Sequence, residues 1–84
     1  MLFFFDTRDG DENSRDDVGI ELPDVGTAKQ QATLALTEMA QDRLPSSGVD
    51  RTLAIRVRTM NGPCFDVSLE YEAVIVSELT TDQK

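Results

Sequence analysis

The sequence predicts an α+β domain of order β-β-α-β-β, a four-stranded, mainly antiparallel sheet with one helix packed on one face. One long helical pattern covers residues 24–43, where apolar side chains recur along one line at 100° per residue. Two runs after it, residues 51–59 and 64 to about 76, alternate apolar and polar side chains as strands do. Two shorter alternating runs, residues 2–7 and 18–22, precede the helix.

The helix organises the chain because its apolar stripe is lined with small side chains. Half of the stripe is alanine, which lets a helix axis lie close to a flat sheet; the stripe comprises Val25, Ala28, Ala32, Ala35, Leu36 and Met39. Asp24 precedes the first turn and is expected to cap it, since its carboxylate can accept backbone N–H groups. Pro45 disfavours helical angles at Leu44 and predicts the end of the helix there.

The region before the helix predicts two strands joined by a polar segment. Alternation in the first strand points Phe3 and Phe5 inward and Phe4 outward, so we expect Phe4 to be exposed or covered by a partner. Residues 9–17 contain no apolar side chain and predict a solvated turn or loop. The run 18–22 predicts a short edge strand paired with the first strand, with Val18, Ile20 and Leu22 on one face.

Parity predicts how the last two strands pair. Their apolar residues share one face only if paired positions sum to an even number, which a two-residue turn does not provide. A three-residue loop over 60–62, with Gly62 in a left-handed conformation, satisfies this condition. The predicted pairs are Val57 with Phe65, Ile55 with Val67, Arg56 with Asp66, and Thr52 with Glu70.

Length and charge favour one acidic domain. The 84 residues carry a net charge of −8, distributed as −6 over residues 1–24, +2 over 25–63 and −4 over 64–84. Such a field repels phosphate backbones, so direct nucleic-acid binding is not expected; the acidity serves solubility alone or matches a basic protein surface or a cation. We expect a single domain over residues 1–79 and a frayed polar tail over 80–84.

Compartment and membrane association follow from what the chain does not contain. One cysteine, Cys64, excludes an internal disulfide and favours a reducing cytoplasm. The amino-terminal apolar run has no preceding basic region and ends at Asp6, so no signal peptide is expected. No apolar stretch reaches the roughly 20 residues that span a bilayer, so no membrane association is expected.

No motif predicts catalysis, a cofactor or a resident metal, and we do not expect an enzyme. Asp9, Asp11, Asn13 and Asp17 have spacings of a calcium-binding EF-hand loop, but the required glycine and twelfth-position acid are Ser14 and Ile20. A solvated loop is therefore expected, and cation binding by residues 9–17 stays an open question. A catalytic thiolate at Cys64 would need an activating group such as histidine, which the chain lacks, so an ordinary strand residue is expected.

The open face of the sheet is the predicted functional surface. Its candidate interaction residues are Phe4, Arg56, Arg58, Asp66, Glu70, Val74 and Val76, although a bulge beyond Tyr71 would turn both valines inward. We expect a protein-interaction or regulatory module that uses this face or its edge strands, with an unknown protein partner or as a homodimer. The alternative is a nucleic-acid-linked regulator: an acidic antitoxin-like partner of a basic protein, or a reader using Arg51, Arg56 and Arg58.

Four segments together resemble a family of short bacterial proteins classed as a domain of unknown function. They are FFDTRDG (4–10), DDVGIELPD (16–24), EMAQD at the end of the helical pattern (38–42) and LAIRVRTMNG (53–62). The chain departs from the family pattern where Val25, Gly26 and Leu34 replace charged residues. The resemblance implies a cytoplasmic α+β domain and no known activity or catalytic residues.

Overall fold

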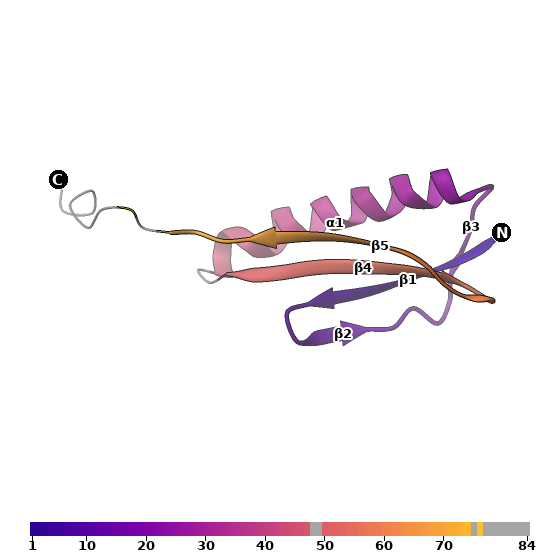
Figure 1. Cartoon of the computed structure of the whole chain (residues 1–84), viewed down its shortest axis with the longest axis horizontal. Helices are drawn as coiled ribbons and strands as arrows, with labels where there is room; N and C mark the ends of the chain where they lie inside the picture. The colour runs from indigo at the N-terminus through magenta and orange to yellow at the C-terminus, as the bar shows by residue number, and fades with distance from the viewer. Residues whose placement is uncertain (48–49, 75, 77–84) are drawn as a thin grey trace.

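The computed structural model describes residues 1–47, 50–74 and 76 as an α+β fold (Figure 1). The elements are β1 (Leu2–Asp9), β2 (Glu12–Ser14), β3 (Ile20–Glu21), α1 (Val25–Ser47), β4 (Arg51–Thr59) and β5 (Gly62–Tyr71). The sheet is antiparallel in the order β2-β1-β4-β5, and β3 also pairs with β1. Helix α1 packs over β4 and β5 on one face, which confirms the predicted architecture with one additional short strand.

The core lies between the helix and the inner face of the sheet. Four sheet residues, Phe3, Leu53, Ile55 and Val57, are fully buried. Ala28 and Ala32 meet them with no exposed surface, so the alanine stripe does allow a close approach of helix and sheet. The predicted stripe is wrong at its first position, because Val25 is 43 % exposed. Periodicity gives the direction of a side chain but not how far the sheet extends beneath it.

Helix α1 begins as predicted and ends later than predicted. Asp24 caps it, since its Oδ1 accepts the Thr27 N–H at 2.8 Å. The prediction that the helix stops before Pro45 is wrong, because α1 continues through Pro45 to Ser47. A proline this near the end removes one backbone hydrogen bond from the last turns only. Leu44 packs against the core, and its burial favours the extra turn.

The polar segment after β1 is more ordered than predicted. Its description as a loop is wrong at β2, where Thr7 pairs with Ser14 and Asp9 with Glu12 across a turn in which Gly10 has a φ of 62°. The predicted strand over 18–22 is reduced to β3, and Val18 is 84 % exposed.

The β4–β5 hairpin has the predicted register. Arg56 pairs with Asp66, and Val57 with Phe65, as parity required. The position of the extra residue was predicted wrongly: Thr59 pairs with Gly62 across a two-residue turn, and the register shifts between Val57 and Arg58. Gly62 has the expected positive φ, 120°.

Strand β5 ends at Tyr71, before the predicted boundary near residue 76. The predicted frayed tail, residues 80–84, lies outside the described residues. Among the residues described, no helix combines the length and the apolar character needed to cross a lipid bilayer.

Candidate interaction surface

The face of the sheet opposite α1 carries a cluster around Arg58. Its Nε donates to Asp6 Oδ2 at 2.8 Å, and its Nη2 donates to the Asp16 carbonyl at 2.7 Å. The guanidinium also stacks over the Phe4 ring, 4.5 Å from the centroid. Phe4 is on the outer face as predicted but only 8 % exposed, so this chain itself covers the aromatic ring.

Asp6 is held ionised by its neighbours. Burial alone would raise the pKa of its carboxyl, but the hydrogen bonds from Arg58 and from the Asp16 N–H outweigh this and leave the pKa lowered. The same bond to Asp6 raises the pKa of Arg58. The Asp6 side chain is 23 % exposed and the Arg58 side chain 16 %, so solvent reaches this ion pair little and its role is structural.

Asp16 closes the outer edge of β1 between β2 and β3. Its Oδ2 accepts the Phe5 N–H at 3.0 Å, in the gap that neither short strand covers. Its Oδ1 accepts the N–H groups of Val18 at 2.9 Å and Gly19 at 3.0 Å. The bond from Phe5, with those from Gly19 and Val18, lowers the pKa of Asp16 despite its partial burial. Because Asp16 takes these N–H groups, Val18 and Gly19 do not extend β3.

Further along the open face, Arg56 and Asp66 form a two-bond ion pair. Arg56 Nε and Nη2 donate to the two carboxylate oxygens at 2.8 and 3.1 Å. These bonds lower the pKa of Asp66. Both side chains are more than half exposed, so the pair neutralises the surface charge and contributes mainly to register.

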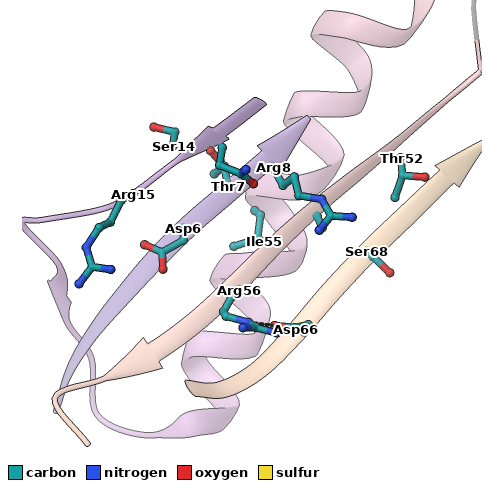
Figure 2. A pocket seen from close by; sticks show the side chains of 12 residues that line it. Asp6, Thr7, Arg8, Ser14, Arg15, Thr52, Ile55, Arg56, Asp66 and Ser68 are labelled. Carbon is teal, nitrogen blue, oxygen red and sulfur yellow. Dashed lines mark hydrogen bonds and ion pairs between the residues drawn. The ribbon is translucent and has the colours of Figure 1, made fainter. Parts of the chain in front are cut away.

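The remaining part of this face forms a shallow depression of about 530 Å³, lined mainly by polar and charged residues (Figure 2). Figure 2 shows Arg8 extending over it from β1, with Thr52 and Ser68 beyond and Arg15 alongside Asp6. Among the described residues no ion pair of Arg8 is present. The face therefore offers scattered hydrogen-bonding groups and no apolar anchor.

A second charge cluster lies on the helix side. Asp9 Oδ2 accepts from Arg43 Nη1 at 2.8 Å, and its Oδ1 is 3.2 Å from Arg51 Nε in an ion pair without hydrogen-bond geometry. Arg51 is thus on the opposite face from Arg56 and Arg58, and the three do not form one basic patch. Within the part of the chain that the structure describes, no group of three or more Cys, His, Asp or Glu side chains is placed to hold a metal ion.

The free side of β5 differs from the covered side of β1. Gly10 N–H donates to the Thr52 carbonyl at 3.0 Å, so the polar backbone groups of Thr52 point toward β1. In an antiparallel ladder this direction alternates along each strand. The backbone groups of Leu53, Ile55 and Val57 therefore point toward β5. On β5 the backbone groups of their partners, Leu69, Val67 and Phe65, point toward β4. The backbone groups of Asp66, Ser68 and Glu70 point to the free edge.

Nothing among the described residues pairs with this edge. Proteins commonly protect edge strands with proline, charged side chains, bulges or short length. In β5 Pro63 and the register shift beside it do so next to the turn, and Asp66 and Glu70 are the two charged side chains along the rest of the strand. The seven residues from Phe65 to Tyr71 contain no proline, glycine or lysine, and their inner-face row is only partly buried: Phe65, Val67, Leu69 and Tyr71.

The structure places the remaining predicted residues as follows. Glu70 is exposed on β5, and Cys64 is a free, exposed thiol beside Pro63. Val74 and Val76 are 70 % and 94 % exposed, but both follow the end of β5 and so do not extend the sheet face. Sequence reasoning missed Asp16, because in a run of acidic residues nothing marks the one that turns toward the backbone.

Comparison with known proteins identifies the family. Neither a curated protein nor a solved structure matches the chain significantly. The family described as Domain of unknown function (DUF6894) matches residues 2–70. This range includes the whole of α1 and all of the strands, apart from the last residue of β5. The chain belongs to this family of unknown function.

Proposed function

We propose that the chain is a protein-interaction module, and not an enzyme, which pairs the free edge of β5 with a β-strand of a protein partner. The observation that carries the proposal is the contrast between the two edges of the sheet. The β1 edge is covered by β2, β3 and the Asp16 carboxylate, whereas no described strand lies beside the outer edge of β5 from Phe65 to Tyr71, where Asp66, Ser68 and Glu70 point their backbone groups outward. Main-chain hydrogen bonds along such an edge supply affinity, and side-chain contacts supply specificity.

In the described part of the chain, the open face of the sheet has no exposed apolar anchor, which favours the edge of β5 as the interaction surface. Phe4 is covered by Arg58, and the two ion pairs engage Asp6 and Asp66. An interface needs a buried apolar or aromatic anchor at its centre, which that face does not present. The partly buried row on β5 does provide apolar contact area beside unpaired backbone groups.

The ion pairs also weigh against the alternative of direct nucleic-acid reading. Arg56 and Arg58 are each bound to an aspartate, and Arg51 lies with Asp9 on the helix side. Contacts with phosphates would have to compete with those carboxylates in a chain of net charge −8. An acidic partner for a basic protein stays compatible with strand pairing.

The test uses Ser68, whose N–H points to the free edge. Ser68→Pro removes that donor and leaves every β4–β5 hydrogen bond in place, whereas Ser68→Ala keeps the donor. Wild-type chain and both variants are immobilised and exposed to cell extract, and the retained proteins are identified by mass spectrometry. We expect a protein, or further copies of this chain, to be retained by wild type and Ser68→Ala and lost with Ser68→Pro. Retention that is the same for all three baits would refute edge pairing.

A further inference from the structure

Building on the proposed function, we infer that the strand which pairs with β5 is β5 of a second copy, in an antiparallel register with Val67 opposite its own counterpart. The result is a two-fold dimer with one continuous sheet of eight principal strands. Closed two-fold dimers are the commonest symmetric assemblies, and they use the same patch on both subunits.

Backbone direction limits the registers. Between Phe65 and Tyr71 the residues that present N–H and C=O groups to the free edge are Asp66, Ser68 and Glu70, so the hydrogen-bonded pairs between copies form at these positions. Paired positions then sum to an even number. In every such register the inner faces of the two copies coincide, and both apolar rows lie on the same side of the joint sheet.

Charge selects one register from this set. Pairing Ser68 with itself places Asp66 opposite Glu70 twice, and pairing Asp66 with itself sets two aspartates face to face; like charges directly opposite are destabilising. Centring the axis on Leu69 sets Asp66 opposite Glu72, again two acids, beyond the end of β5. Centring the two-fold axis on Val67 avoids all three arrangements. It places Asp66 opposite Ser68 and Phe65 opposite Leu69, so that the apolar row of each copy meets apolar residues of the other.

A second copy would also cover the apolar row on the inner face of β5, which a single added strand would leave exposed. The row on the inner face of β5 is only partly buried, although α1 contacts both β4 and β5. A two-fold axis perpendicular to the sheet puts both helices on the same face. With strands roughly 4.8 Å apart, helices that each lie over the space between β4 and β5 would be about 10 Å apart. This is the separation at which helices pack, so the partner's helix would cover the apolar row.

The first experiment measures the assembly directly. Sedimentation velocity at increasing concentration should show a monomer–dimer equilibrium for wild type and for Ser68→Ala. Ser68→Pro should weaken the dimer at least about tenfold, because each copy loses an inter-chain hydrogen bond and gains a ring at the interface. A strict monomer at high micromolar concentration, or a dimer indifferent to Ser68→Pro, would overturn the inference.

The second experiment tests the register and does not depend on how Ser68→Pro folds. In a Cys64→Ser background, Val67→Cys places two thiols in a closely spaced non-hydrogen-bonded pair, within the roughly 4.4 to 6.8 Å Cα separation of disulfides. Ser68→Cys in the same background places them beyond reach in this register. Mild oxidation should cross-link Val67→Cys at least about tenfold faster than Ser68→Cys. Preferential cross-linking of Ser68→Cys would overturn the register.

The two proposals fail separately. If wild type is monomeric but the capture assay finds another protein whose retention is lost with Ser68→Pro, the second copy is the wrong partner and edge pairing stands. If wild type is monomeric and no Ser68→Pro-sensitive partner is captured, both proposals are wrong.

Discussion

Replacing Asp16 with alanine removes one carboxylate from three backbone hydrogen bonds at once. Phe5 N–H loses its acceptor in the gap between β2 and β3, and Val18 and Gly19 lose the acceptor that orders the segment leading into β3. Alanine also leaves the Phe5 and Gly19 donors partly buried without a partner.

The size of the effect follows from the three bonds. A hydrogen bond of this kind contributes about 0.5 to 1.5 kcal/mol net, and the exposed bond from Val18 belongs at the low end of that range. We therefore expect Asp16→Ala to lower the free energy of unfolding by about 2 to 3 kcal/mol, or the melting temperature by roughly 10 to 20 °C. Asp16→Asn should lose about half as much, because its amide keeps one accepting oxygen and turns a donor toward Phe5 N–H.

Urea unfolding followed by circular dichroism at low micromolar concentration measures this change as a shift in midpoint at constant slope. Asp17→Ala is the matched control. It removes a neighbouring carboxylate whose only ion pair among the described residues is with Arg15 at 3.4 Å, between side chains more than two-thirds exposed. Its effect should stay within about 0.5 kcal/mol. Equal midpoints for Asp16→Ala and Asp17→Ala would refute the role assigned to Asp16.

Three further outcomes are expected. Ala32→Leu should destabilise the chain by about 1 to 3 kcal/mol in the same urea assay, because Ala32 has no exposed surface between α1 and the sheet, whereas exposed Gln31→Leu should change little; equal effects would contradict the close helix packing. The pKa values of Asp6, Asp16 and Asp66 are lowered from 3.8, so the stabilisation from these carboxylates is fully present above about pH 5 and is lost as pH falls through the lowered values. The urea midpoints of wild type and Asp16→Ala, measured at decreasing pH, should therefore converge, and a difference that stays constant with pH would contradict this. Because each copy carries −8, raising sodium chloride from about 0.05 to about 0.5 M should tighten the dimer severalfold in sedimentation, and weakening would contradict an apolar interface.

The parts of the fold that were predictable from sequence are those fixed by a repeating pattern. Parity alone placed Arg56 opposite Asp66, since a slip by one residue would turn every apolar side chain of β5 outward. The alanine spacing placed Ala28 and Ala32 against the sheet. In both elements many residues carry the same signal, so one unusual position does not change the result.

The parts that were not predictable depend on single tertiary contacts. Strand β2 is three polar residues without apolar alternation, and it forms because β1 offers an edge beside it. Phe4 looked exposed because its cover is Arg58, 54 positions further along the chain. Helix α1 passes Pro45 because tertiary packing of Leu44 outweighs a local preference.

Hydrogen exchange along β5, followed residue by residue by NMR at low and high protein concentration, tests the central claim most directly. The backbone directions predict that the amides of Val67 and Leu69 are protected at every concentration. The amides of Asp66 and Ser68, which pair with each other across the two-fold axis, should exchange freely in the dilute monomer and become protected as the dimer forms. If these two amides are already protected in the monomer, or stay unprotected while the chain dimerises, the free edge of β5 is not the pairing surface.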